Sequence, residues 1–456
     1  MLEERFAPVV EAEPDVLARH WTEAGAAEKA AVYRLKAGER ALAHSATAEA
    51  VAQLTMGQEL LQSLPDGDER RRRELDLQIA LGTALGAARG QAAPETARAY
   101  ARARELCGEL GEERRLVPVL LGLWASHNAR DELGAARTVA AQLLELAERR
   151  HDGAAGILGH RALGATLFGL GEFAAARTHL QQLLALDGSA AGHSPASLPY
   201  DPCASGRAWL ALTLAVLGYP EQAVAQANEA LAEAGRLGHH NTTALVLSLR
   251  CSVGQFLRDH HDVATRAEAL LAVAVEQDFA YWTGLGMYFR GWARARAGEI
   301  MAGIGEMRRA LAACQGTGAK AYVPYNLALL ADTCRRAGDA PQGRKLLDEA
   351  LDRLGRTDAR YCEAELLRID GELRLAMSRP DRDGAEVSFR RAIEVAHRQA
   401  AKAAELRAAM SLARMWADRG KQRQAYDLLA PIYGWFTEGF DTADLKDAKA
   451  LLDELA

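Results

Sequence analysis

The feature of this sequence that most limits its fold is a recurring order of small residues and turn glycines. In "GWARARAGEIMAGIGEMRRAL" these positions are Gly291, Gly298, Gly303, Met307 and Ala310. Steps of seven, five, four and three residues between small, glycine, small, apolar and small positions are typical of the tetratricopeptide hairpin. The glycine ends one helix in the left-handed conformation, and the small residues allow the next helix to pack closely. The segment therefore predicts two packed helices joined by a tight turn.

The same order recurs along the chain, and the small residue that opens each second helix serves as an anchor for one repeat. The anchors are Ala50, Ala97, Ala136, Ala176, Ala223, Ala264, Gly303, Gly343, Ala385 and Ala425. Nine steps cover the 375 residues from the first anchor to the last, a mean of about 42 against 34 in the standard motif. At Ala97, Ala136 and Ala264 no turn glycine stands seven residues after a small one, so these placements depend on spacing alone.

Composition agrees with helices, because 49% of the residues are hydrophobic but only 6% are aromatic, which leaves mostly alanine and leucine. We expect an all-α fold, a right-handed superhelical solenoid of about ten TPR-like hairpins with repeats of about 40 residues. The expected domains are a lead-in helix within residues 1–26, a repeat array over 27–438 with a surface loop near 187–202, and a capping helix within 439–456.

Several classes of protein are excluded by what the sequence lacks. A net charge of −6 with mixed signs argues against nucleic acid as a partner. The chain has no signal peptide and no apolar run of about 18 residues, which predicts a cytoplasmic protein without a membrane partner. Six widely spaced cysteines fit free thiols. Phosphate-binding, metal-binding and nucleophile motifs are missing, so we expect no cofactor, no metal and no enzymatic activity.

Counting from the anchors predicts which side chains face the concave groove of the array. The predicted ligand-binding wall consists of Tyr288, Trp292, Tyr325, Arg335, Glu365 and Arg368. Such a mixture of aromatic and charged residues suits an extended peptide or a small ligand. It is equally compatible with a solvated inner wall, and the neighbouring Phe279, Trp282 and Phe289 are expected to be core residues.

Several segments are more specific than the repeat pattern. They are "LGYPEQA", "RAEALLAVAVEQ", "RGWARARAGE", "YCEAELLRIDGEL" and the final "SLARMWADRGKQRQAYDLLAPIYGWFTEGFDTADLKDAKALLDEL". They resemble the carboxy-terminal tetratricopeptide region of bacterial signalling proteins in which an AAA-type ATPase module, often preceded by a class III nucleotide cyclase domain, comes before the repeats. The resemblance implies a sensor or scaffold tail in signal transduction, whose family carries its cyclase and ATPase motifs upstream of the part matched here.

Three functional hypotheses follow. The first is a non-catalytic module that binds a protein or peptide partner, including an ATPase or cyclase module, or a small effector in its groove. The second is a structural or oligomerising solenoid without a specific ligand. The third is an enzyme on a helical-hairpin scaffold, with Glu363, Glu365 and Glu372 as candidate acids.

Overall fold

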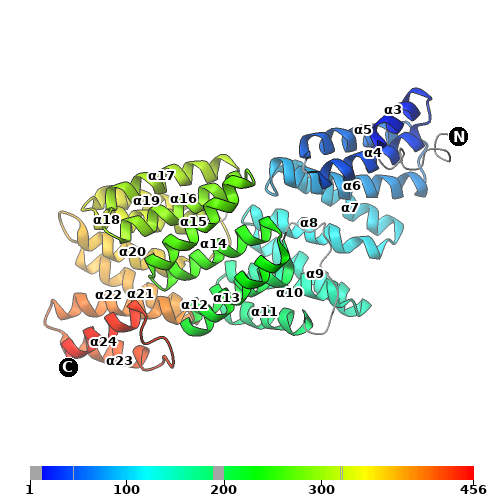
Figure 1. Ribbon diagram of the computed structural model, residues 1–456. Coiled ribbons are helices and arrows are strands. Elements are labelled where there is room, and N and C mark those ends of the chain that lie inside the picture. The colour runs from blue at the N-terminus through cyan, green and yellow to red at the C-terminus, as the bar shows by residue number, and fades with distance from the viewer. Residues whose placement is uncertain (1–12, 45, 188–199, 319, 321) are drawn as a thin grey trace. The chain divides into compact units, whose positions relative to one another are not determined.

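A computed structural model of the protein describes residues 13–44, 46–187, 200–318, 320 and 322–456 (Figure 1). Within these residues the chain is all-α, with 22 α-helices, one short 3-10 helix and no β-strand. The helices follow one another as the paired hairpins of a TPR-like solenoid. The predicted fold class is therefore confirmed, whereas most of the predicted loop near 187–202 lies outside the described residues.

The chain divides into two compact units, Met1–Arg149 and Arg150–Ala456. The helices of the first unit are α3 (Pro14–Glu23), α4 (Ala27–Ala43), α5 (Thr47–Gln62), α6 (Asp68–Arg89), α7 (Pro94–Leu110), η1 (Glu113–Arg115), α8 (Leu116–Ala129) and α9 (Leu133–Arg150), which ends at the boundary. The second unit opens with α10 (Gly153–Gly169), α11 (Phe173–Asp187), α12 (Pro202–Leu217), α13 (Pro220–Leu237), α14 (His240–Phe256), α15 (His260–Glu276), α16 (Ala280–Arg296) and α17 (Ile300–Gly316). It continues with α18 (Val323–Arg336), α19 (Ala340–Gly355), α20 (Glu363–Ala376), α21 (Arg382–Arg398), α22 (Lys402–Ala417), α23 (Gln422–Tyr433) and α24 (Ala443–Leu455).

Most of the predicted anchors occupy the fourth residue of a second helix, where they are buried against the first. The six fully buried alanine anchors are Ala50, Ala136, Ala176, Ala223, Ala385 and Ala425. Five residues before several anchors stands a left-handed turn glycine, and these glycines are Gly171, Gly218, Gly298, Gly338 and Gly420. The local pattern therefore sets both the turn and the helix contact of these hairpins.

Two of the three placements that depended on spacing alone are wrong by one residue. Ala264 and Ala97 are only partly buried, whereas their neighbours Val263 and Thr96 are fully buried at the hairpin contact. In the first case Arg258 takes the left-handed turn position with a φ of 58°, five residues before Val263. Because Arg258 and not a glycine occupies this turn, the sequence offers no turn glycine from which the anchor position can be counted.

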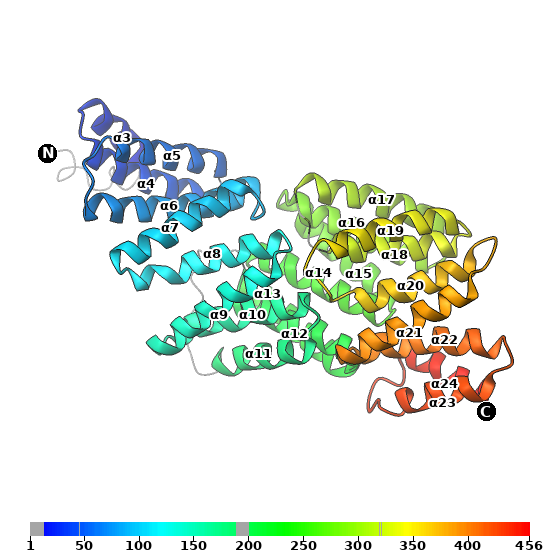
Figure 2. The same ribbon diagram turned by 180° about the vertical axis from the view of Figure 1, so that it is seen from behind.

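The second unit folds back so that its last helices contact its earlier ones. Figures 1 and 2 show the C-terminal helices, in orange and red, beside the green α12–α13 hairpin. The backbone N–H groups of Arg360 and Tyr361 donate to the carbonyl of Gly169 over 2.8 and 3.2 Å. The backbone N–H of Gly439 donates to the Glu221 carboxylate over 2.9 Å. These contacts join segments about 190 to 220 residues apart, so they are set by the curvature of the array.

Candidate functional site

An aromatic cavity of about 70 Å³ lies inside the second unit. Its lining comes from the first helices of five successive hairpins, α10, α12, α14, α16 and α18, and from the turn before α20. Nine aromatic residues contribute, namely Phe168, Trp209, Phe256, Tyr281, Trp282, Phe289, Tyr322, Tyr325 and Tyr361. In a chain with few aromatic residues, this concentration marks the cavity as the candidate binding site.

The rings of the lining hold one another in place. Phe256 and Tyr325 stack nearly in parallel, with centroids 5.6 Å apart and an angle of 8° between planes. Trp209 and Tyr322 are stacked at 6.3 Å, and Tyr361 meets Tyr322 edge-to-face at 5.6 Å. Such pairs favour fixed relative orientations, so the cavity presents a preformed apolar wall to a ligand.

Polar groups of the lining divide into paired and unpaired ones. The hydroxyls of Ser248 and Ser252 donate to backbone carbonyls of their own helix over 2.7 and 3.1 Å. By contrast, the buried indole N–H of Trp209 and the buried amide nitrogen of Gln255 have no hydrogen-bond partner among the described residues. None of the described lining residues is charged.

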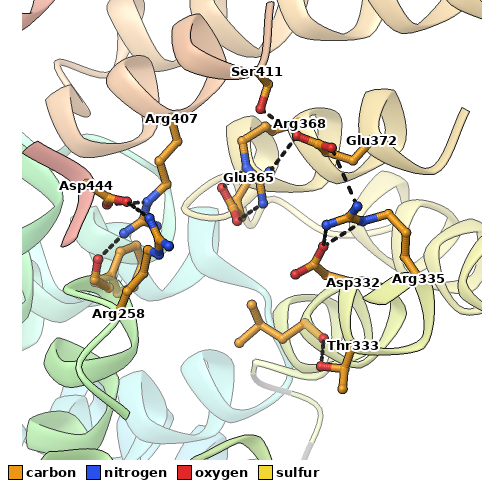
Figure 3. A network of polar contacts seen from close by, with 12 residues as sticks. Arg258, Asp332, Thr333, Arg335, Glu365, Arg368, Glu372, Arg407, Ser411 and Asp444 are labelled. Atoms are coloured by element: carbon orange, nitrogen blue, oxygen red, sulfur yellow. Dashed lines mark hydrogen bonds and ion pairs between the residues drawn. The ribbon is translucent and has the colours of Figure 1, made fainter. Parts of the chain in front are cut away.

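A buried ionic network adjoins the cavity through the helices α18, α20 and α22 (Figure 3). Arg335 donates two hydrogen bonds to Asp332, over 2.8 and 3.0 Å. Arg368 holds Glu365 in the same way, over 2.7 and 2.9 Å, and reaches Glu372 at 3.5 Å. The Ser411 hydroxyl donates to Glu372 over 2.7 Å. Acids and arginines therefore satisfy one another along this wall.

Electrostatics keep Asp332 of this network ionised. Burial alone would raise the pKa of Asp332, but the positive charges of Arg335, Arg368 and Arg296 outweigh it and lower the pKa to about 2. Burial likewise opposes ionisation of Arg368, yet Glu365 and other acids raise its pKa overall. The network is therefore a set of fixed charge pairs at neutral pH.

A short chain of contacts connects the cavity with the C-terminal helix. The Phe256 ring lines the cavity, and the Phe256 carbonyl accepts a hydrogen bond from Arg407. Arg407 also donates to Asp444 over 2.6 Å, and Arg258 donates to the same carboxylate over 2.9 Å. Asp444 lies in the first turn of α24. Arg407 and Arg258 lower its pKa against the opposing effect of burial.

The residues of the predicted ligand-binding wall occupy different environments. Tyr325 lines the cavity, and Arg335, Glu365 and Arg368 come together in the ionic network. Tyr288 and Trp292 are only 1% and 2% exposed, so they pack inside the wall, where the Tyr288 hydroxyl donates to the Asn326 carbonyl over 2.6 Å. Whether these six residues bind a ligand stays a prediction.

Sequence reasoning missed most of the cavity lining. Phe289 is 3% exposed, as expected of a core residue, and it also lines the cavity, whereas its neighbour Tyr288, about 100° away around the helix, does not. Phe168, Trp209 and Tyr361 are separated by up to 193 positions in the sequence. A usable signal was available, because Trp209 and Phe289 each stand fourteen residues before an anchor.

The candidate acids of the enzyme hypothesis are neutralised rather than free. Glu365 and Glu372 both pair with Arg368, and Glu363 lies 3.9 Å from Arg360. Among the described residues no group of three or more His, Cys, Asp or Glu side chains could hold a metal ion. No helix in the described ranges is both long and apolar enough to cross a bilayer.

Comparisons with known proteins agree with the fold and leave the function open. No family model matches the chain. An uncharacterized protein of Rhizobium meliloti (strain 1021) is 25% identical over 401 residues, which cover 87% of this chain but only 38% of that protein. The chain thus spans well under half the length of this relative.

Solved structures with similar folds include a Rap protein complexed with competence and sporulation factor, at a TM-score of 0.54 and 14% identity, covering 86% of this chain and 100% of that one. A signal transduction ATPase with numerous domains from Pyrococcus horikoshii, which has a tetratricopeptide repeat sensor, matches 88% of this chain and 56% of its own at 14% identity. Its TM-score of 0.45 is too low to support an argument from this structure. The protein is a TPR-like helical repeat protein, and the similarity establishes its fold alone.

Proposed function

We propose that this chain is the non-catalytic, ligand-sensing repeat region of a bacterial signalling protein. A small effector or a peptide segment binds in the aromatic cavity, and binding changes how the C-terminal helix α24 is held. The responding partner is an ATPase or nucleotide cyclase module, in the same protein or in a neighbouring chain. A relative that extends far beyond the matched region, and a Rap protein of the same fold complexed with competence and sporulation factor, support this proposal.

The observation that carries the proposal is the position of Phe256. Its ring forms part of the cavity wall, and its carbonyl is tied through Arg407 to Asp444 of α24. A ligand that displaces the Phe256 ring shifts the end of α14, to which this hydrogen bond is attached. Because the Arg407–Asp444 pair is buried, it resists being stretched and transmits the shift instead.

Ligand binding is tested by thermal unfolding of the purified chain against a panel of small aromatic compounds and a panel of apolar peptides. A ligand that binds only the folded state raises the melting temperature. Ser252→Leu fills the cavity and should abolish the rise, whereas Thr243→Leu adds similar bulk to the same helix outside the lining and should preserve it. If no compound or peptide raises the melting temperature, the structural solenoid is the better description.

The relay is tested by hydrogen exchange of the α24 amides with and without a ligand found in this way. Binding should change the exchange rates of residues 443–455 in the parent chain. In Arg407→Met, which removes both hydrogen bonds, the ligand should still bind but leave the rates unchanged. Equal responses in the two proteins would contradict the relay through Arg407.

A further inference from the structure

We infer that the aromatic cavity takes a small, uncharged, planar compound that carries a hydrogen-bond acceptor, such as an aromatic ketone or amide. This inference rests on the proposed function and names the chemistry of its ligand. It depends on three properties of the lining, which are its two unpaired donors, its lack of charge and its size.

The unpaired donors determine what the ligand must offer. Trp209 is 6% exposed and Gln255 is 4% exposed, and in both the nitrogen that carries the donor hydrogen is covered by neighbouring side chains. A buried donor without a partner costs free energy that a single acceptor recovers. Because the Ser248 and Ser252 hydroxyls already donate within α14, the donors that need a partner are nitrogen groups. The ligand therefore supplies an oxygen or nitrogen acceptor, and the inference requires that the Trp209 and Gln255 side chains turn their covered N–H groups towards it on binding.

The absence of charge in the lining determines what the ligand must lack. An anion or a cation buried there would lose its hydration without meeting an opposite charge in the wall. Aromatic faces attract cations, but two buried donor groups in the same wall oppose a positive charge. A neutral compound avoids both penalties.

The size and shape of the cavity limit the ligand body. About 70 Å³ is room for roughly five waters, which suits a compound with one ring rather than a folded peptide segment. The near-parallel Phe256 and Tyr325 rings and the stacked Trp209 and Tyr322 rings form flat walls. A planar body makes the largest contact with such walls.

The test uses four probes that share a benzene ring and differ in charge and acceptor: acetophenone, ethylbenzene, benzoate and phenyltrimethylammonium. Affinity is measured by titration calorimetry with the full chain. We expect acetophenone to bind up to about a hundredfold more tightly than ethylbenzene, since its oxygen accepts two buried hydrogen bonds and each is worth about tenfold. The two ions should bind more weakly than acetophenone.

Matched variants identify the donors. Trp209→Phe and Gln255→Met should each reduce acetophenone affinity about tenfold and leave ethylbenzene affinity unchanged. Trp21→Phe is the control, because its indole nitrogen is also buried and unpaired but lies in α3 of the first unit, outside the cavity lining. It should leave both affinities unchanged. Without ligand, Trp209→Phe should lower the melting temperature through lost packing, because Trp209 is only 6% exposed, so the role of its N–H is judged from the two affinities and not from stability.

The inference is overturned if benzoate or phenyltrimethylammonium binds more tightly than acetophenone, or if ethylbenzene binds equally well. It is also overturned if no probe binds while an apolar peptide raises the melting temperature, a result that would leave the proposed function intact. Loss of acetophenone binding in all three variants, including Trp21→Phe, would indicate general damage to the fold and remove the support for these donors.

Discussion

The carboxylate of Glu438 accepts hydrogen bonds from the backbone N–H of Gln222, over 3.1 Å, and from its side-chain amide, over 2.9 Å, across 216 positions of sequence. The same carboxylate accepts the backbone N–H of Glu221 over 3.0 Å. Tyr219, at the N-cap of α13, offers no side-chain cap of its own. A residue from the C-terminal turn therefore caps a helix of an earlier hairpin, and its negative charge suits the helix N-terminus.

Removing this cap should weaken the closure of the second unit. Glu438→Ala leaves two helix N–H groups of α13 without their acceptor and should cost about 1 kcal/mol of unfolding free energy, the usual value for a lost N-cap. Chemical denaturation of the two proteins measures the difference. Glu454→Ala, at an exposed position of α24, serves as the control and should unfold like the parent. Equal midpoints for all three proteins would refute the capping role.

The buried Arg407–Asp444 pair should contribute far more than an exposed pair of the same chemistry. Arg407→Met removes one of the two arginine partners of a carboxylate that is 11% exposed and leaves Arg258 as the other, so the expected cost is about 1.5–3 kcal/mol, the value of a hydrogen bond to a charged group. Arg423→Met breaks a pair whose side chains are 88% and 56% exposed and should change stability by less than about 1 kcal/mol. Urea unfolding of both variants provides the comparison. Similar losses in the two would contradict the importance of this closure.

Gly303 should tolerate no added methyl group, although helices generally prefer alanine to glycine. A Cβ at this position would overlap the carbonyl of Gly291 and lie 2.8 Å from the backbone nitrogen of Ala295, and backbone atoms cannot move aside easily. Gly303→Ala should therefore cost about 1–3 kcal/mol. Gly305, two residues later, faces only the flexible Arg309 side chain, so Gly305→Ala should gain about 0.5–1 kcal/mol. Melting temperatures should move in opposite directions.

Acidification should destabilise the fold first through a pair of histidines. His160 and His179 meet with Nδ1 atoms 3.0 Å apart, and burial, assisted by His179, lowers the pKa of His160 from 6.5 to about 4. Between pH 6.5 and about 4, His160 therefore binds a proton in the unfolded chain but not in the folded chain. Stability is complete above pH 6.5 and declines as the pH falls from 6.5 towards 4.

The variant His160→Asn should flatten the pH dependence of stability in that range, while His240→Asn, at an exposed position, should leave it unchanged. Loss of stability below pH 3.8 results from protonation of acids such as Asp332, whose pKa in the folded chain is about 2. Denaturation midpoints at several pH values separate the two ranges. An unchanged slope in His160→Asn between pH 6.5 and 4 would exclude this histidine as the cause.

The sequence by itself determined the hairpins, because each depends on interactions within about 40 residues. Gly171 and Gly218 mark left-handed turns, and Ala176 and Ala223 mark close helix contacts, at spacings that a single repeat fixes. Where Arg258 replaces the turn glycine, the same reasoning predicted the anchor at Ala264, one residue after the buried Val263. The structure has the helices α3 and α24 within residues 1–26 and 439–456, the ranges given for the lead-in and capping helices.

The cavity and the closure of the second unit were decided by the tertiary structure alone. Phe168 and Tyr361 share one cavity because the curvature of five stacked hairpins brings them together, and small packing angles add up over that distance in a way that no local pattern records. Glu438 reaches α13 for the same reason. Local spacing therefore predicted which residues form each helix, whereas the accumulated twist of the array determined which of them meet.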